Sequence, residues 1–224
     1  PHYHNLSPNN MLSRHVFVPL VSQDSKQALE PGLAESWKAV DDTTWEFKLR
    51  RNVKFFDGSD FTADDVLATF KRVPNVPRSP SSFASFIAGL TVEKVDSHTI
   101  RIKTAAPAPL VPTNLSTFGI VSKACAETLS TEDFNAIKCQ SGTGPFKYTE
   151  FKPGDRIVME RNNAFAGAKP DWEKVTFRFL TAAPTRVAAL LAGDVDVIEG
   201  VPPSDMARLK SNANLEVVQE LSNR

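Results

Sequence analysis

The first residues that could do chemistry are two histidines near the start of the chain. His2 and His4 form an HxH motif, and in an extended strand both imidazoles would lie on the same face. A protein zinc site normally uses at least three protein ligands. No third ligand is near them in the sequence, so we predict no metal site and favour a solvent-exposed or cleft-lining role for both histidines.

Four aspartates form a second cluster. A calcium loop spaces its oxygen ligands through roughly twelve residues and ends in glutamate. Asp57, Asp60, Asp64 and Asp65 do not follow that pattern. We therefore predict turn and capping roles, with Thr62 as the N-cap of a helix and Asp65 reaching back to it in a capping box.

A glycine-rich stretch is the third candidate. A phosphate-binding loop leads into the N-terminus of a helix, but Gly142-Thr143-Gly144-Pro145 leads into a strand pattern. We predict a tight backbone crossing at which a side chain would clash. The sequence also lacks the GxSxG, Walker, HExxH and paired CxxC motifs. We therefore predict no catalytic residues, no cofactor and no enzymatic activity.

Two phenylalanines follow a proline-rich loop at 74–80. Phe83 and Phe86 could pack in the core, or they could form the aromatic wall of a ligand cleft. The residue pattern leaves both alternatives open.

The composition is that of an ordinary folded protein. The chain has 224 residues, of which 41% are hydrophobic and 23% charged, and its 26 basic residues balance its 26 acidic residues. This balance argues against nucleic acid as a partner, because phosphate binding needs a basic excess or stripe. No apolar run reaches the ~20 residues of a transmembrane helix. We expect a monomer without a transmembrane segment.

The two cysteines bear on the cellular compartment. Cys125 and Cys139 are not spaced as a CxxC motif, and two thiols alone cannot build a structural zinc site. A disulfide is favoured, and two unrelated buried thiols remain the alternative. A loop of this length would stabilise the fold by about 3 kcal/mol in the chain-entropy model, and the bond would indicate an oxidising compartment.

Hairpins and short helices are the elements that would position these residues. Trp45, Phe47 and Leu49 alternate with polar residues, which is the period of a half-buried strand. Apolar spacing predicts helices over 9–21 and from position 62 to just before Pro74. Paired strands are predicted over 34–40 with 44–50, 92–95 with 99–103 and 146–151 with 156–161, and a strand or crossover is predicted over 120–122.

The last third of the chain predicts a different arrangement. Strands are expected over 174–180, 195–198 and 215–220, alternating with helices over 184–192 and 202–210. This order favours a parallel or mixed sheet with helices on its faces, so the fold class is α/β. Because Pro1 follows no leader and the last strand stops near the end, we also expect a fragment of a longer protein.

Several segments, in order and in register, resemble the peptide/nickel class of extracellular solute-binding proteins of ABC importers, the dipeptide- and oligopeptide-binding protein family. The resemblance rests on motifs of the form P-x-L-A-x-S-W, F-x-L-R-x-x-V-x-F-x-D-G, T-A-x-D-V, G-T-G-P-Y and L-x-x-G-E-x-D. Phe146 replaces the tyrosine of G-T-G-P-Y, and the tryptophan of a further R-N-x-x-Y-W motif is absent after Phe165. The matching segments begin at 31, 47, 62, 142 and 190.

The resemblance implies a periplasmic-binding-protein-like class II lobe. In such proteins two lobes close on a ligand, and this chain would cover most of the first lobe, with the second missing. Residues 1–20 and 120–224 would form an incomplete sheet subdomain, and 21–119 an extra hairpin-rich subdomain. The ligand-lining positions carried over from the family are His4, Asn5, Leu6, Ser7 and Phe83.

The function implied is peptide transport. The protein would be the substrate-binding component of an ABC importer, capturing a small solute such as a di- or oligopeptide and delivering it to the permease subunits. It would be periplasmic, or extracellular and membrane-anchored in a Gram-positive organism. The alternatives are a sensor or chaperone on the same fold, a carrier of a metal chelate, opine, haem or oligosaccharide, and an enzyme whose site is completed by missing residues. With half the cleft missing, we expect this chain alone to bind its ligand weakly.

Overall fold

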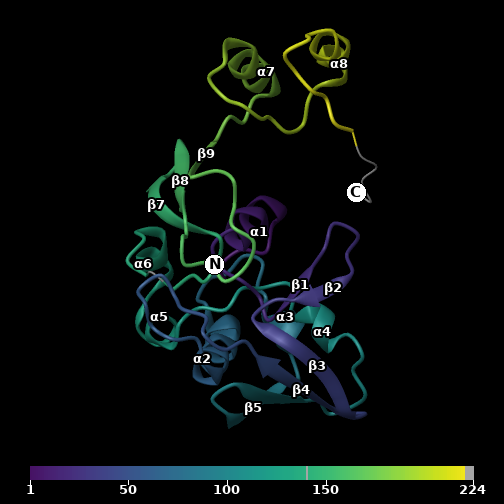
Figure 1. Cartoon of the computed structure of the whole chain (residues 1–224), viewed down its shortest axis with the longest axis vertical. Coiled ribbons are helices and arrows are strands. Elements are labelled where there is room, and N and C mark those ends of the chain that lie inside the picture. The colour runs from purple at the N-terminus through teal and green to yellow at the C-terminus, as the bar shows by residue number, and fades with distance from the viewer. Residues whose placement is uncertain (140, 220–224) are drawn as a thin grey trace. The chain divides into compact units, whose positions relative to one another are not determined.

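The computed structural model describes residues 1–139 and 141–219 as a mixture of helices and antiparallel strands (Figure 1). The strands are β1 (Val21–Gln23), β2 (Leu29–Pro31), β3 (Ala34–Asp41), β4 (Thr44–Leu49), β5 (Thr91–Asp96), β6 (Thr99–Lys103), β7 (Phe146–Lys152), β8 (Arg156–Arg161) and β9 (Lys174–Arg178). The helices are α1 (Ser7–Arg14), α2 (Ala63–Arg72), the 3-10 turn η1 (Val73–Asn75), α3 (Ala84–Ile87), α4 (Val111–Asn114), α5 (Lys123–Thr128), α6 (Thr131–Asn135), α7 (Ala183–Ala192) and α8 (Pro203–Lys210).

The chain forms two compact units. The first comprises Pro1–Phe151 and Ile157–Thr176, and the second comprises Lys152–Arg156 and the chain from Phe177 onward. A hydrophobic core lies in the first unit and is built from residues between Leu20 and Ile120. The predicted subdomain boundaries near positions 20 and 120 fall inside the first unit, so they stay a prediction about its internal division.

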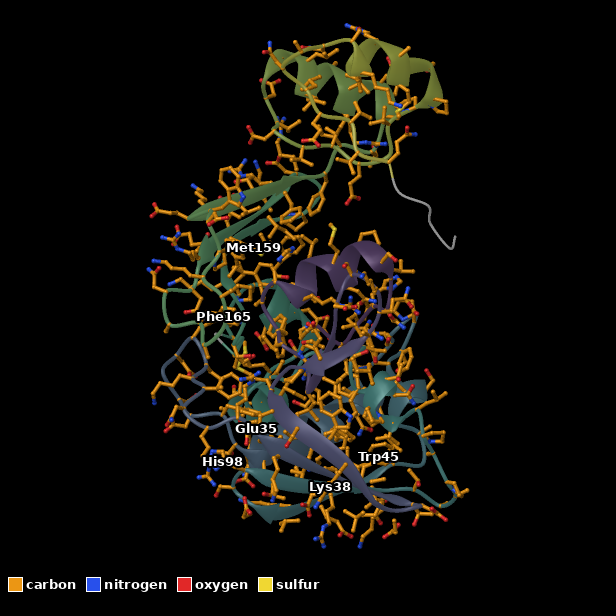
Figure 2. All side chains as sticks on the ribbon, turned by 45° about the vertical axis from the view of Figure 1, so that its right-hand side comes forward. Glu35, Lys38, Trp45, His98, Met159 and Phe165 are labelled. Carbon is orange, nitrogen blue, oxygen red and sulfur yellow. A yellow bond between two sulfur atoms is a disulfide. The ribbon has the colours of Figure 1, made fainter. Side chains whose placement is uncertain are left out.

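A four-stranded antiparallel sheet contributes buried side chains from β4 and β6 to this core. Its strand order is β3-β4-β6-β5, and the two hairpins predicted from the sequence form its halves. Phe47 and Leu49 of β4 are buried as the alternation predicted, and Trp45 is half-buried, with its indole Nε1 donating to the Ala108 carbonyl at 3.1 Å. Figure 2 labels Glu35, Lys38 and Trp45 on this sheet.

Helix α2 begins as predicted. Thr62 is its N-cap, and the capping box with Asp65 is present. Asp65 also accepts a hydrogen bond at 2.7 Å from the backbone N–H of Lys123, at the start of α5. The helix packs against α5 and β5, and it ends at Arg72, after which Pro74 lies in the η1 turn.

The predicted helix over 9–21 was wrong in its extent. Helix α1 begins at Ser7 and ends at Arg14. Pro8 lies in its first turn, where proline is tolerated because the backbone N–H has no partner within the helix. Beyond Arg14 the backbone bonds to other segments instead: His15 and Val16 carbonyls accept from Phe146 and Gly144 N–H groups, at 3.0 and 2.9 Å. These bonds to distant residues compete with continuing the helix.

The glycine-rich stretch is confirmed as a close backbone crossing. A Cβ on Gly142 would collide with the Val16 carbonyl and the Phe56 ring, and one on Gly144 would collide with the carbonyls of His15 and Val16. Only glycine permits this approach without displacing a backbone.

The predictions for the strands over 195–198 and 215–220 were wrong for the described residues. Neither 195–198 nor 215–219 forms a strand, and position 220 lies outside the described residues. Val197 and Val218 are 81% and 73% exposed. The expected alternation of strands and helices in the last third is therefore absent from the described part, because an apolar segment becomes a strand only when its backbone finds a partner. Positions 120–122 form a crossover, bonded through Ile120 N–H to the Val18 carbonyl at 3.0 Å.

A disulfide joins Cys125 in α5 to Cys139, after α6. It closes a loop that contains α6, and Arg72 of α2 holds the same loop from the side. The Arg72 guanidinium lies 4.5 Å from the centre of the Phe134 ring and donates to the Leu129 carbonyl at 2.8 Å. No helix within residues 1–139 and 141–219 is long and apolar enough to cross a membrane.

Candidate functional site

The predicted ligand-lining segment lies immediately before α1 and at its first residue. Its backbone is bonded to the loop that precedes Phe83: His4 forms a parallel bridge with Ser81, and the Asn5 N–H donates to the Ser81 carbonyl at 2.9 Å. The Ser81 hydroxyl also donates to the Asn5 carbonyl at 3.3 Å. Residues about 76 positions apart in the sequence are thus fixed beside each other.

The four side chains of this segment differ in exposure. Leu6 is 51% exposed, whereas His4, Asn5 and Ser7 are half-buried. The Asn5 Oδ1 accepts a hydrogen bond from Asn10 Nδ2 at 2.7 Å, so an amide of α1 orients it. The His4 Nδ1 is buried without a hydrogen-bond partner in the described structure.

Phe83 packs in the core, which is one of the two alternatives that its sequence left open. Its side chain is 1% exposed and belongs to the core, where it packs against Phe86 and Phe118 with ring centres 6.2 and 6.5 Å away. It also lines a pocket beside α1. Its predicted contact with a ligand stays a prediction.

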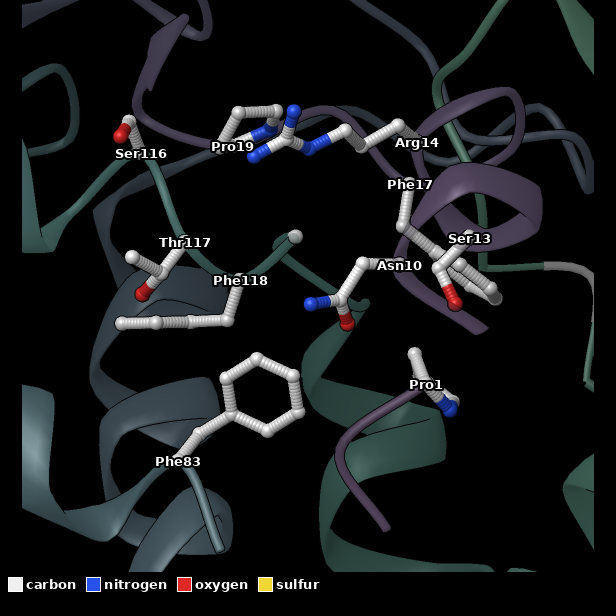
Figure 3. Close-up of a pocket in the computed structure, with 11 residues that line it drawn as sticks. Pro1, Asn10, Ser13, Arg14, Phe17, Pro19, Phe83, Ser116, Thr117 and Phe118 are labelled. Atoms are coloured by element: carbon white, nitrogen blue, oxygen red, sulfur yellow. The ribbon is translucent and has the colours of Figure 1, made fainter. Parts of the chain in front are cut away.

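The pocket beside α1 brings together three stretches of chain that are distant in sequence (Figure 3). Its volume is about 10 Å³, which is room for roughly one water molecule. A peptide therefore does not fit into this pocket as it stands. The lining comprises Pro1, Asn10, Ser13, Arg14, Phe17, Pro19, Phe83 and residues 116–119.

The sequence predictions missed the α1 side chains that line this pocket. Asn10, Ser13 and Arg14 lie in α1, where residues three and four positions apart share one side of the helix, and Phe17 follows after the helix has ended. The spacing of the three helical residues was visible in the sequence and could have identified them. Residues 116–119 carry no such signal, because only the folded chain brings them beside α1.

The expectation for His2 was wrong. We predicted a solvent-exposed or cleft-lining histidine, but its side chain is 1% exposed, and its Nε2 lies 2.8 Å from the Gly119 carbonyl. Burial lowers the pKa of His2 to about 3. The ring is therefore neutral at pH 7, and Nε2 donates to the Gly119 carbonyl. This hydrogen bond fixes one end of the 116–119 segment that lines the pocket. Among the residues described, no group of three or more His, Cys, Asp or Glu side chains could hold a metal ion.

The C-terminal end of α1 is held by contacts with the buried Tyr148. The Ser13 side chain hydrogen-bonds the Tyr148 hydroxyl, whose pKa is raised chiefly by burial. The Phe17 and Tyr148 rings lie 6.3 Å apart. These contacts fix the helix that presents Asn10 and Arg14, so the lining of the pocket is preorganised.

Comparison with known proteins gives a consistent result. The family described as bacterial extracellular solute-binding proteins, family 5 Middle, matches residues 28–224. The chain is 30% identical over 197 residues to a probable D,D-dipeptide-binding periplasmic protein, DdpA, of Escherichia coli, and 32% identical over 219 residues to the nickel-binding periplasmic protein of the same organism. These matches cover 85% and 93% of this chain, but only 38% and 41% of the relatives.

The fold is similar to that of solved structures. The oligopeptide-binding protein AppA from Bacillus subtilis, in complex with a nonapeptide, superposes with a TM-score of 0.83 at 26% identity, over 96% of this chain and 44% of that chain. The chain thus spans less than half the length of the relatives it matches. The α/β class and the resemblance predicted from the sequence are confirmed. With the family matched over most of its residues and the same fold in solved relatives, this chain belongs to the bacterial extracellular solute-binding proteins of family 5.

Proposed function

We propose that this chain is part of the substrate-binding component of an ABC importer, which captures a di- or oligopeptide in the periplasm and delivers it to the permease. Family membership supports the binding role. Relatives named as binding proteins for D,D-dipeptides, murein peptides and oligopeptides support a peptide as cargo.

The chemistry of the surface around α1 is the observation that carries the peptide proposal. Asn5 and Asn10 offer amide groups that match a peptide backbone, Arg14 offers a cation for a carboxylate, and the exposed Leu6 offers apolar area for side chains. Ligand sites typically combine apolar walls with a few placed polar groups in this way. Backbone recognition with apolar walls tolerates varied side chains, as a peptide carrier requires.

The proposed role needs binding and no reaction. Closure around a ligand requires a surface whose affinity for the ligand is higher in the closed state than in the open one. These relatives carry the names of binding proteins. We therefore propose a non-enzymatic protein that works with ABC permease subunits.

A metal chelate is the second candidate cargo. The nickel-binding periplasmic protein of Escherichia coli is 32% identical to this chain, and it matches over 93% of the residues. The binding experiment therefore includes Ni²⁺ with free histidine as a competitor cargo.

The test is an NMR titration of the ¹⁵N-labelled chain with a tripeptide, with its C-terminally amidated form, and with Ni²⁺-histidine. Because the pocket beside α1 has room for about one water molecule, we expect weak, millimolar binding. The tripeptide should shift the amide signals of residues 5–14 and 83. Arg14→Gln should weaken binding about tenfold, as expected when a charge-assisted hydrogen bond is lost. Arg51 is an exposed arginine outside the pocket, so the matched control Arg51→Gln should bind the tripeptide as the wild type does.

The amidated tripeptide separates the role of Arg14 from that of the rest of the surface. It should bind the wild-type chain and the Arg14→Gln variant equally, because it has no carboxylate. Shifts of residues 5–14 with Ni²⁺-histidine and none with either peptide would replace the peptide proposal by the metal-chelate one. No shift at 20 mM (roughly the upper limit of weak specific binding) with any of the three would contradict both.

A further inference from the structure

A second cavity lies in the first unit and shares no lining residue with the pocket beside α1. Its volume is about 240 Å³, which is large enough for a small organic molecule and several waters. Three stretches form its walls: the chain before α1, the proline-rich loop after η1, and the first turns of α6 inside the disulfide loop. Its lining residues are Tyr3, Pro77, Arg78, Thr131, Glu132 and Asn135.

The walls of this cavity are held from outside it. The Ser79 hydroxyl donates to the Tyr3 carbonyl at 2.6 Å, which joins the chain before α1 to the proline-rich loop. The Cys125–Cys139 disulfide and the stacking of Arg72 on Phe134 hold the segment that carries α6. Fixed walls reduce the conformational entropy that a ligand must remove on binding.

Two opposite charges face each other at the cavity without forming a tight pair. Arg78 Nη2 and Glu132 Oε1 are 4.0 Å apart, and the side chains are 87% and 75% exposed. A charge-assisted hydrogen bond would be roughly 2.7–2.9 Å long. Within residues 1–139 and 141–219, neither group has another ion pair, so the donors of the guanidinium and the oxygens of the carboxylate remain open to a ligand.

The backbone of Arg78 is a further feature of the cavity wall. Arg78 has a backbone φ of 54°, a left-handed conformation that a non-glycine residue rarely adopts. Strain of this kind gathers at ligand-holding positions, and here it belongs to the residue with the cation.

We propose that this cavity binds a free α-amino acid in its zwitterionic form. The carboxylate of the amino acid lies against the Arg78 guanidinium, and its ammonium lies against the Glu132 carboxylate. This arrangement is possible because Arg78 Nη2 and Glu132 Oε1 are 4.0 Å apart, so the two groups can contact neighbouring charges of one small ligand. The ligand side chain lies toward the exposed ring of Tyr3. The nearby Lys138 and Asp133 are already paired at 2.7 Å, so the cavity has one open charge of each sign.

This site is separate from the peptide-binding role, and its proposal does not depend on that role. The two sites lie on different residues, so their amide signals distinguish them: residues 77–79 and 131–135 report the amino-acid site, and residues 5–14 report the surface around α1. Failure at one set of signals leaves the other set unaffected.

The experiment is an NMR titration of the ¹⁵N-labelled chain with L-leucine, N-acetyl-leucine and leucinamide. Leucine carries both charges, and each analogue lacks one of them. Leucine should shift the signals of residues 77–79 and 131–135, and each analogue should bind roughly three- to fivefold more weakly, because one contact with an exposed charge is lost. Arg78→Gln and Glu132→Gln should each weaken leucine binding by a similar factor. Arg51→Gln and Glu127→Gln, two exposed residues that do not line the cavity, are the matched controls and should bind as the wild type does.

Three outcomes would overturn the proposal: no shift of these signals at high leucine concentration, equal binding of leucine and N-acetyl-leucine, or full affinity in Glu132→Gln. Equal binding of the acetylated analogue would mean a simple anion site on Arg78. If a variant does not fold, the three ligands still decide the matter on the wild-type chain.

Discussion

At the scale of single residues, Glu46 shows how a charge is accommodated on the polar face of a strand. The register across the four-stranded sheet places Lys38, Glu46, Arg101 and Glu93 in one row of alternating charge. Glu46 is 8% exposed and lies 2.9 Å from Arg101 and 3.6 Å from Lys48. Cross-strand pairs of opposite charge stabilise sheets. The pair of Glu46 with Arg101 is held by the least exposed carboxylate of the row.

Glu46→Gln should destabilise the chain at neutral pH, and the difference from wild type should shrink in acid. The hydrogen bond from Arg101 is the main reason that the pKa of Glu46 is held below its usual value of 4.5. A group whose pKa is lower in the folded state stabilises the fold above its unfolded pKa, and this contribution is lost as the pH falls through the folded pKa. Urea unfolding midpoints measured at pH 7, 5 and 3.5 test this.

Glu93→Gln is the matched control in the same sheet. Glu93 also pairs with a cation, Lys103 at 2.8 Å, but both side chains of this pair are about half exposed. Exposed ion pairs contribute little, so at pH 7 the urea midpoint should change less than it does in Glu46→Gln. A Glu46→Gln midpoint that equals the wild type at pH 7 would contradict the role given to the Arg101 contact.

At the scale of elements, the same capping device starts two helices in different surroundings. Thr62 with Asp65 caps the ten-residue α2, and Ser130 with Asp133 caps the five-residue α6. Asp65 is 6% exposed and also accepts from Lys123 N–H, so the α2 box joins two helices. Asp133 instead takes its further contact from an exposed lysine, Lys138.

Thr62→Ala should lower the free energy of unfolding by about 1 kcal/mol, the usual loss for an N-cap. Ser130→Ala should lower it less, because α6 is short and has no buried residue to transmit the loss to the core. Chemical denaturation of both variants compares them directly. An equal or larger loss in Ser130→Ala would show that the disulfide loop contributes more to global stability than its burial indicates.

At the scale of the whole molecule, the two compact units differ in how much apolar surface they bury. The first holds a core of large side chains that includes Phe47, Phe61 and Ile102. In the second, the buried residues of α7 and α8 are Val187, Ala189 and Leu209, while Val197 is exposed. Local stability follows buried apolar contacts, so the units should open at different free energies.

Native-state hydrogen exchange should resolve this difference. Amides of α2, β4 and β6 should exchange only on global unfolding, whereas those of α7 and α8 should exchange at least about ten times faster. The measurement is made on the intact chain at low denaturant. Equal protection in α7 and β4 would mean that the whole chain unfolds as one cooperative unit.

The sequence predicted best where the signal is local. The strand period of β4, which buries Phe47 and Leu49, and the capping box at Thr62 each depend on residues within one turn or strand, and each is present. The motifs that carried the family resemblance are also local, and the family is confirmed. Apolar patterns without a local partner failed, as at Val197, because a strand also needs a neighbouring backbone.

By itself, the sequence determined the α/β class, the hairpins, the start of α2 and the family, because short-range sterics, hydrogen bonding and periodicity are written in neighbouring residues. Tertiary structure alone decided that α1 stops at Arg14, that His2 is a buried neutral histidine, and that Phe83 lies beside residues 116–119. It also brought Arg78 opposite Glu132. These outcomes depend on contacts between residues far apart along the chain, and burial and charge pairing at such contacts exist only once the chain has folded.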